Sequence, residues 1–443
     1  MIQSSFAEGP AWVAMTSPAA DVMPLDAYAA LGDAAVFWEK PLSGESLAGF
    51  GAADCREVSR TGQPFQIIDE LAELLCPGRI TWLANSGAPR PPGPWFGGFA
   101  FDQHRRSTAR WSGFPAAKWI LPELLIWRRG GSSFATAFCS ASRGLREADA
   151  VVRNRVAAFQ KKLPRRFQRE DNRRGRLAAT SDRSAWDRLI HAALRSIDEG
   201  SITKVVLARS IAVESDRPFD LPRILAWLRK SVPGCTVFSM RGNEGATFLG
   251  ATPETLCRVD GRLLETEAIA GSAPEPGEPP LTPTDKEARE HRAVIDGIEQ
   301  ALQPLCERLQ IDASPGVMGL PHLRHLRTEI RGRLRADVAL SKIVAALHPT
   351  PAVGGAPRDR ALRFIAEREN LDRGWYAGPI GWIGDGAAEL AVAIRSAIIR
   401  ASEANLFVGA GVVAGSTAEG EWLETEAKSL TLLEAIGGGI GVR

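Results

Sequence analysis

A lysine stands at the head of an apolar stretch near the middle of the chain. In SITKVVLARS, residues 201–210, a strand period of two puts Lys204, Val206 and Ala208 on one face. An ammonium on an apolar face must reach water, find an anion or lose its proton. Lys204 therefore either extends its head to solvent or is a desolvated lysine whose lowered pKa suits a base or a nucleophile. The residues alone leave both interpretations open.

A second group of ionisable residues lies in EGEWLETEAKSL, near the end of the chain. At about 100° per residue, a helix there gathers Glu421, Glu424 and Lys428 on one face. Such carboxylates suit Mg²⁺, which binds through one or two carboxylates and keeps positions open for substrate and water. The obvious second contributor is the helix that carries Glu287 and Glu290. The alternative is an ordinary exposed ion pair between Glu424 and Lys428.

Four more polar residues occur inside apolar segments. They are Glu254 in FLGATPETL, Glu267 in ETEAIAGS, His348 in LHPTPAVGG and Arg395 in AVAIRSA. Each of them alone is explained as structure, because buried polar groups are usually hydrogen-bonded parts of the fold. Together they are many charges for apolar strands, which favours a single cleft on which they converge.

The elements that position these residues follow from apolar periodicity. We expect helices at 184–200, 221–232 and 285–309, and another from about Glu419. We expect strands at 201–210, 235–240, 246–251, 375–384, 389–399 and 404–415. Strands and helices that mix without a regular βαβ rhythm indicate an α+β fold with large antiparallel sheets.

The first part of the chain has a different character. Up to about residue 160 it is rich in Trp and Gly, and short apolar segments alternate with Pro and Gly breakers, which predicts mostly strands. A basic run, KKLPRRFQREDNRRGR, follows at 161–176. It has no apolar periodicity, so we interpret it as a solvated connector, placed at 161–180, in preference to a nucleic-acid patch.

Composition narrows the class of protein further. The 443 residues are 44% apolar, and 54 lysines and arginines nearly balance 52 aspartates and glutamates. This balance gives no global field that would recruit nucleic acid or an anionic membrane. The six cysteines lack the close pairing of zinc or redox motifs, which predicts reduced, packed thiols. Without a basic leader or a long apolar stretch, we expect a cytoplasmic protein, and without heptads a monomer or weak homodimer.

Nine motifs occur together in a fixed order. They are KVVLAR, FLGATPETL, ETEAIAGS, KEAREH, LHPTPAVGG, RGWYAGPIGW, AVAIRSA, VGAGVVAGS and EWLETEAKSL. In order and spacing they resemble the pattern of the chorismate-utilising enzymes, and within that family the chain looks most like the isochorismate synthases. WFGGFAFD, residues 95–102, resembles the family's amino-terminal half.

The resemblance implies a fold. It is one large α+β domain in which two antiparallel β-sheets pack as a sandwich with helices outside. Residues 1–160 would form the amino-terminal half of this sandwich and residues 181–443 the chorismate-binding catalytic region. The basic segment at 161–180 would then be an inserted connector and not a domain boundary.

The resemblance also implies roles for the residues that match its motifs. Glu290 and Glu424 would hold Mg²⁺, the expected cofactor, with Glu421 acting through water. Lys204 would be the general base and Glu254 the general acid. The substrate, chorismate, would be bound by Gly271, Ser272, His348, Tyr376, Arg395, Gly411 and Lys428.

The chemistry of the expected reaction makes sense of these residue types. Chorismate is a dicarboxylate, so its binding calls for fixed cations and a metal ion. Moving the hydroxyl from C4 to C2 requires a water to lose a proton as it attacks C2, while the departing C4 oxygen gains one. A base and an acid on opposite walls are therefore needed. Desolvation displaces both pKa values in the required direction, lowering that of Lys204 and raising that of Glu254.

The branch of the family depends on a few positions. Aminodeoxychorismate synthases carry a nucleophilic lysine in a PIKGT motif, where this chain has Ala270, and anthranilate synthases typically carry glutamine at the position of Lys204. Both branches are disfavoured, because a lysine base suits water as the nucleophile. A salicylate synthase, which eliminates pyruvate from isochorismate in the same pocket, is the alternative. A catalytically silent chorismate-binding homologue is a third, disfavoured because the acid and the base are both retained.

Overall fold

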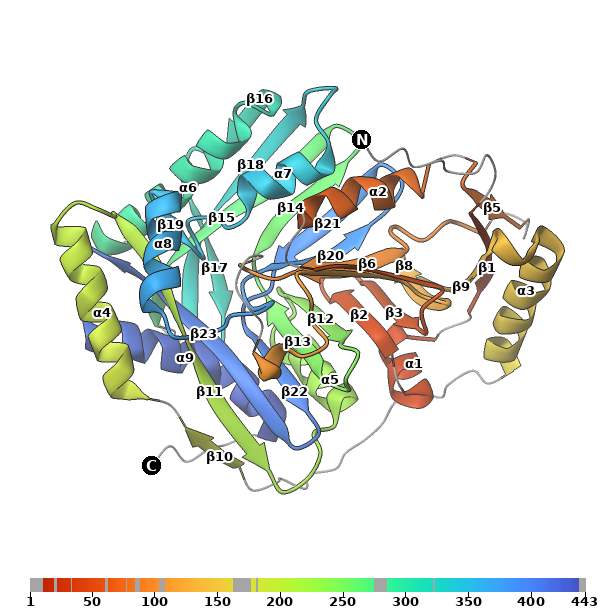
Figure 1. The fold of residues 1–443 in the computed structure, drawn as a ribbon, viewed down its shortest axis with the longest axis horizontal. Coiled ribbons are helices and arrows are strands. Elements are labelled where there is room, and N and C mark those ends of the chain that lie inside the picture. The colour runs from red at the N-terminus through yellow and green to blue at the C-terminus, as the bar shows by residue number, and fades with distance from the viewer. Residues whose placement is uncertain are drawn as a thin grey trace.

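The computed structural model describes residues 11–19, 22–32, 34–59, 63–76, 78–83, 88–102, 108–161, 177–180, 182–274, 285–321 and 323–437. The strands in these ranges form two large sheets, which pack on either side of a shared hydrophobic core (Figure 1). Short 3₁₀ helices lie at Pro64–Gln66, Ala109–Trp111 and Ala141–Arg143.

The first sheet contains strands from both the amino-terminal and the carboxyl-terminal parts of the chain. Its strands, in spatial order, are β10 (Leu177–Thr180), β11 (Lys204–Ser215), β23 (Glu403–Val413), β22 (Ser396–Arg400), β13 (Thr247–Thr252), β12 (Thr236–Arg241), β2 (Ala34–Lys40), β3 (Glu45–Phe50), β8 (Leu124–Arg129), β9 (Ser132–Ser140), β1 (Trp12–Pro18) and β5 (Ile80–Trp82). The short strand β19 (Gly355–Ala356) also pairs with β11. Pairing of β12 with β2 makes the amino-terminal half continuous with the rest.

The second sheet also combines strands from early and late parts of the sequence. Its strands, in spatial order, are β16 (Cys306–Ile311), β18 (Leu323–Leu334), β15 (Leu263–Pro274), β14 (Thr255–Asp260), β21 (Ala387–Val392), β20 (Pro379–Ile383), β6 (Trp95–Phe99), β7 (Ala117–Leu121) and β4 (Asp54–Val58), with β17 (Gly316–Leu320) paired to β18. Among the described pairs of both sheets, β1 with β5 is parallel and the others are antiparallel.

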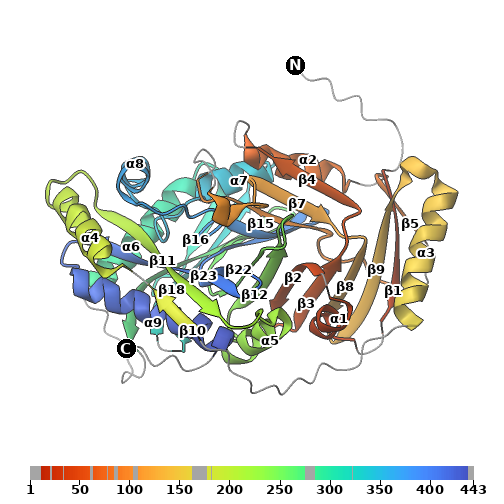
Figure 2. The ribbon, with the colours of Figure 1, turned by 60° about the horizontal axis from the view of Figure 1, so that its bottom comes forward.

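Helices cover the outer faces. They are α1 (Pro24–Leu31), α2 (Ile67–Glu73), α3 (Leu145–Lys161), α4 (Arg183–Asp198), α5 (Leu221–Ser231), α6 (Asp285–Leu302), α7 (Leu340–Leu347), α8 (Arg358–Arg368) and α9 (Ala418–Gly437). Figure 2 shows α1, α5 and α9 below the first sheet and α2 and α7 on the opposite side of the molecule. A separate cluster of buried apolar side chains joins α1, α5 and α9 to the first sheet. The predicted α+β sandwich with outer helices is thus confirmed.

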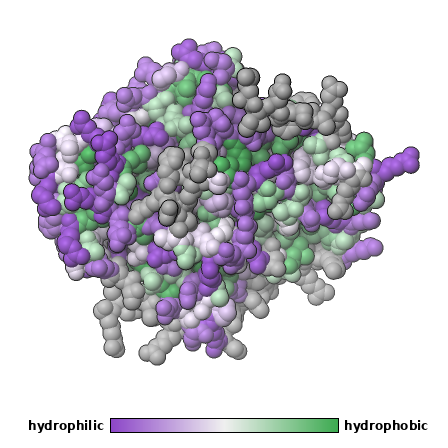
Figure 3. Space-filling model, viewed as in Figure 1, coloured by the Kyte–Doolittle hydropathy of each residue, from purple (hydrophilic) through white to green (hydrophobic). Residues whose placement is uncertain are grey.

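Capping residues explain where two of the predicted helices begin. The Asp182 carboxylate accepts a hydrogen bond from the Ala185 amide at 2.9 Å and starts α4. The Asp220 carboxylate does the same for the Arg223 amide at 3.2 Å and starts α5. Each cap satisfies an amide that the helix itself leaves unpaired. The surface over α4 and α8 is strongly hydrophilic (Figure 3), because both helices turn several arginines to solvent.

Aromatic side chains fill the space between the sheets. Trp111 stacks on Phe407 of β23 with ring centroids 5.2 Å apart. On the side of the second sheet, Phe99 of β6 meets Trp119 of β7 at 5.6 Å. Each such ring removes on the order of 150–250 Å² from water, so the cluster contributes much of the stability of the fold. The tryptophans of the amino-terminal region therefore belong to the core that both sheets share.

The structure corrects three element predictions. Residues 389–399 form two strands, β21 and β22, which belong to different sheets, and not one. In the segment 375–384, the first residues form a turn and the strand starts at Pro379. Helix α6 ends at Leu302, before residue 309, because Pro304 lacks an amide hydrogen and disfavours a helical residue before it. The chain then continues as β16.

Other predictions agree with the structure only in part or fall partly outside the described residues. The connector at 161–180 falls largely on residues 162–176, which lie outside the described residues, and residues 177–180 form β10. All six cysteines are unpaired, as predicted, but Cys55 and Cys76 are exposed and not packed. Among the described helices, none combines the length and the apolar character needed to cross a membrane.

Candidate active site

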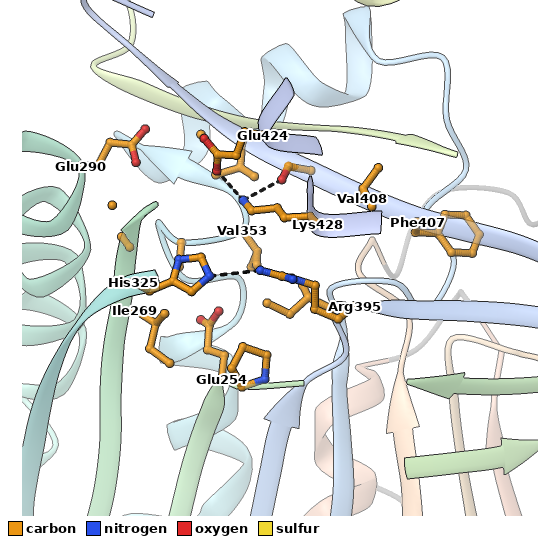
Figure 4. Close-up of a pocket in the computed structure, with 18 of the residues that line it drawn as sticks. Glu254, Ile269, Glu290, His325, Val353, Arg395, Phe407, Val408, Glu424 and Lys428 are labelled. Atoms are coloured by element: carbon orange, nitrogen blue, oxygen red, sulfur yellow. Dashed lines mark hydrogen bonds and ion pairs between the residues drawn. The ribbon is translucent and has the colours of Figure 1, made fainter. Parts of the chain in front are cut away.

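A pocket lies between the sheets, where the chain twice passes from one sheet to the other. The passage from β13 to β14 occurs at Pro253 and Glu254, and that from β21 to β22 at residues 393–395. The two passages adjoin, because the Val392 amide donates to the Glu254 carbonyl at 3.0 Å. The pocket holds about 680 Å³ of atom-free space, including its mouth (Figure 4). Its apolar lining includes Ile269, Ala352, Val353, Ile394, Phe407 and Val408.

Lys204 lines this pocket from the first residue of β11. The residue is only 2% exposed, so its ammonium does not extend to solvent. In the β11–β23 ladder Val206 faces Gly411. A Cβ atom at Gly411 would lie 3.1 Å from Cε of Lys204 and 3.2 Å from Oε1 of Glu290. The glycine therefore lets the lysine and this carboxylate approach each other.

The electrostatics of Lys204 and Glu254 are complementary. Burial lowers the pKa of Lys204, and Lys428 lowers it further, while Glu290 opposes both. Burial raises the pKa of Glu254 to about 8, and Glu267 adds to this shift against the effect of Lys204. Both displacements favour the neutral forms near pH 7, an amine that can accept a proton and a carboxylic acid that can donate one.

Glu254 is held at the crossing between the sheets. Its amide donates to Oγ1 of Thr252 at 3.2 Å, and Oγ1 of Thr350 donates to its Oε1 at 3.4 Å. Figure 4 draws Glu254 at one end of the pocket and Glu290 and Glu424 at the other. An acid and a set of carboxylates are thus separated by the space that a substrate would occupy.

Arg395 and His325 form a buried pair on the wall of the pocket. The guanidinium Nη2 lies 3.1 Å from Nε2 of His325. Because a guanidinium only donates, Nε2 accepts and the ring proton resides on Nδ1. Burial, with help from Arg395 and Lys428, holds the pKa of His325 well below its usual value, so the ring is neutral. Arg395 has a φ of 51°, a left-handed conformation that turns the chain between the sheets.

Lys428 and Tyr376 complete the predicted substrate-binding wall. Nζ of Lys428 lies 2.6 Å from Oε1 of Glu424 and donates to the Gly409 carbonyl at 3.0 Å. Both ends of this ion pair line the pocket, so it is not the ordinary surface pair of the alternative interpretation. The Tyr376 ring stacks on Phe407 with centroids 5.4 Å apart. Gly271 also lines the pocket and has a φ of 75°.

Three carboxylates from two helices gather beside the pocket. Burial raises the pKa of Glu290 to about 7, with Lys204 opposing and Glu424 adding to the shift. Burial and Glu424 also raise the pKa of Glu421, against the effect of Lys286. Oε1 of Glu290 and Oε2 of Glu421 are buried without a hydrogen-bond partner. Buried carboxylate oxygens in this state call for a cation, so these residues fit a divalent ion.

Ammonium groups hold two of these carboxylates in the present conformation. Lys286 lies 2.6 Å from Glu421, and Lys428 lies 2.6 Å from Glu424. Within the part of the chain that the structure describes, no three His, Cys, Asp or Glu side chains are close enough to form a ready metal site. The fit to a divalent ion therefore rests on the unpartnered oxygens and on the charge of the cluster.

Two of the predicted site residues, His348 and Glu421, do not line the pocket. His348 is buried elsewhere, where its Nε2 donates to the Phe101 carbonyl at 3.1 Å and burial lowers its pKa to about 3. Ser272 lies in β15 opposite His325, and its side chain is outside the described residues. Glu421 is completely buried behind the pocket. The structure thus brings together Lys204, Glu254, Gly271, Glu290, Tyr376, Arg395, Gly411, Glu424 and Lys428.

Two residues at the site were not predicted. His325 is two positions after Leu323 on the buried side of β18, so strand alternation could have marked it as a buried polar residue. Thr350 lies in the same LHPTPAVGG motif as His348, and it is Thr350 that reaches Glu254. Glu267, by contrast, is a structural acid, since it accepts from the Thr255 amide and from Arg327.

Comparison with known proteins places this site in a family. The family model described as chorismate binding enzyme matches residues 3–437. The chain therefore belongs to the chorismate-binding enzymes, as the motifs predicted, and chorismate is the substrate of that family.

Its named relatives define the branch more closely. The salicylate biosynthesis isochorismate synthase of Pseudomonas aeruginosa is 32% identical over 98% of this chain and 92% of its own. The isochorismate synthase MenF of Bacillus subtilis is 33% identical over 77% of this chain and 74% of its own. The solved structure of MenF, the menaquinone-specific isochorismate synthase from Escherichia coli, superposes with a TM-score of 0.76 at 26% identity, covering 98% and 96% of the two chains.

Proposed function

We propose that the protein is an isochorismate synthase, an Mg²⁺-dependent isomerase that converts chorismate to isochorismate. The observation that carries the proposal is the placement of Lys204 and Glu254, both buried in one pocket, with pKa values displaced toward their neutral forms. The names of the relatives support the same activity. In this reading Glu290 and Glu424 hold the metal ion, and Glu421 supports it through water.

The residues of the pocket divide the work of the reaction. Neutral Lys204 takes a proton from the water that attacks C2 of chorismate. Protonated Glu254 delivers a proton to the C4 oxygen as the C4–O bond breaks, so that the hydroxyl leaves as water. One water is consumed and one is released, and the net reaction is an isomerisation. The buried pocket keeps bulk water away from both proton transfers.

Fixed charges orient the substrate. Arg395 and Lys428 supply cations for the substrate carboxylates, and Gly271 and Gly411 allow close approach of the backbone. A bound Mg²⁺ would neutralise a substrate carboxylate and so draw the ring into the pocket. His325 keeps the Arg395 guanidinium in place from the side. We assign the same binding role to Tyr376, which lines the pocket, and to Ser272 on the resemblance of its motif alone.

The test is to incubate the protein with chorismate and Mg²⁺ and to follow the products by chromatography and fluorescence. Isochorismate as the sole product supports the proposal. Salicylate with pyruvate would instead identify a salicylate synthase, and unchanged chorismate would identify a catalytically silent binding protein. Omitting Mg²⁺, or adding a chelator, should abolish turnover if the metal assignment is right.

For the compartment, the oligomeric state and the pathway, we keep the sequence-based predictions as proposals. We propose that it works in the cytoplasm as a monomer or weak homodimer, with chorismate as its small-molecule partner. Its product would enter menaquinone or siderophore biosynthesis. The printed names of two relatives mention menaquinone and salicylate biosynthesis. Size-exclusion chromatography with light scattering tests the oligomeric state directly.

A further inference from the structure

Lys286 of α6 forms an ion pair whose two ends differ in access to solvent. Its Nζ lies 2.6 Å from Oε1 of Glu421 on α9. The Glu421 side chain is 0% exposed, whereas the Lys286 side chain is 32% exposed. Oε2 of the same carboxylate has no hydrogen-bond partner. The lysine can therefore leave toward water, but the carboxylate cannot.

The position of Lys286 in its helix is electrostatically unusual. It is the second residue of α6, and a cation in the first turn of a helix is repelled by the partial positive charge of the amino-terminal end. The neighbouring carboxylates outweigh this effect. Burial tends to lower the pKa of Lys286, but Glu421, Glu290 and Glu424 together raise it. The lysine thus contacts Glu421 directly and lies within the electrostatic influence of Glu290 and Glu424.

The other ammonium groups near the cluster are more firmly held. Lys428 bonds to both Glu424 and the Gly409 carbonyl, and its side chain is only 16% exposed. Lys204 is 2% exposed and lines the pocket. Both are less exposed than Lys286, so neither has a comparable route to solvent. Lys286 is the ammonium of the three with both an acidic partner and an open route.

We propose that Lys286 is a built-in counter-cation that neutralises the acidic cluster before metal binds and must leave Glu421 when a divalent cation enters. The ammonium and the divalent cation compete for the same charge. The inference rests on the proposed metal site and concerns how strongly that site binds. Lys286 is a positioning residue here and takes no part in proton transfer.

The test is metal affinity without substrate, measured by calorimetry with Mg²⁺ and by electron paramagnetic resonance with Mn²⁺, at pH 8. Lys286→Met keeps the length of the side chain and removes its charge. We expect its dissociation constant for either ion to fall about tenfold, since a competing ion pair is removed. Arg292→Met is the matched control, because Arg292 lies on the same helix in an exposed pair with Asp296. Its metal affinity should equal that of the wild type.

A second variant moves the result in the opposite direction. Lys286→Arg keeps the charge and offers a forked donor that can engage both Glu421 oxygens, so metal binding should weaken by about threefold or more. This variant retains the ion pair and keeps the inference testable if Lys286→Met fails to fold. A purely structural lysine would leave the metal affinity of both variants unchanged, which would overturn the inference. A wild-type protein that binds neither ion would overturn the metal site itself.

Discussion

Glu254 and Arg395 lie at the two places where the chain crosses between the sheets beside the pocket. Glu254 stands between β13 and β14, and Arg395 between β21 and β22. The Ala251 amide donates to the Arg395 carbonyl at 3.1 Å, so the two crossings are joined through the backbone. The backbone thereby fixes an acid and a cation on one wall of the pocket, among the apolar side chains that line it.

Replacing Lys204 should remove the base. We expect Lys204→Ala to lower the turnover of chorismate by at least about a hundredfold, the usual contribution of a positioned acid or base. Product formation followed by chromatography measures the effect. The control is Lys230→Ala, an exposed lysine of α5 that should leave turnover unchanged. Near-normal turnover in Lys204→Ala would show that the base is another group.

Glu254 should make the protein less stable as the pH rises. Its pKa is about 8 in the folded protein, against an ordinary value of 4.5 for a glutamate, so between these pH values the folded state binds a proton that the unfolded state has lost. The contribution of Glu254 to the free energy of unfolding is therefore fully present below about pH 4.5 and is lost as the pH rises through about 8. In Glu254→Gln the group no longer titrates.

The measurement is urea unfolding of the wild type and Glu254→Gln at pH 5 and pH 8. Relative to the wild type, the variant should gain about 3.5 kcal/mol in the free energy of unfolding from pH 5 to pH 8, because its side chain does not titrate. A change in hydrogen bonding caused by the amide would affect both pH values equally. It should also lose turnover, as an amide cannot donate the required proton. An equal difference in stability at both pH values would mean that Glu254 is ionised throughout.

Gly411 should be intolerant of a side chain for a local reason. A Cβ atom there would lie 3.1 Å from Cε of Lys204 and 3.2 Å from Oε1 of Glu290. We expect Gly411→Ala to fold with a stability within about 1 kcal/mol of the wild type, because only side-chain ends must move. Its turnover should fall by about tenfold or more, because displacement of a catalytic group by even 1 Å is costly. Gly319→Ala, at an open position, is the control for steady-state kinetics.

The buried pair of Glu369 and Arg373 should support the wall that carries Lys204. Glu369 accepts from the Ala208 amide at 2.8 Å, and Arg373 donates to the carbonyls of Val206 and Val353 at 2.8 and 3.0 Å. Glu369→Ala leaves the guanidinium buried and unpaired, so we expect a loss of about 3–5 kcal/mol in the free energy of unfolding.

Chemical denaturation compares this variant with Glu367→Ala, which removes an exposed carboxylate from α8, the helix that ends just before Glu369. The control should lie within about 0.5 kcal/mol of the wild type. A similarly small effect in Glu369→Ala would show that water or another group replaces the carboxylate beside Arg373.

The sequence by itself determined the family and much of the local structure around the candidate site residues. Alternation in 201–210 placed Lys204 on an apolar face, and helical spacing put Glu421, Glu424 and Lys428 together, because both patterns depend only on neighbours along the chain. The motifs predicted the family, which the family match confirms, and with it the sandwich.

Only the tertiary structure decided how these residues meet. The segment 389–399 is apolar almost throughout, since both of its strands are buried, and no local pattern shows that β21 and β22 belong to different sheets. Periodicity could indicate that His348 and His325 are buried but not that one faces Phe101 and the other Arg395. The local sequence pattern predicts which residues are buried. The hydrogen-bond partner of a buried polar group depends instead on strand pairing between segments hundreds of residues apart.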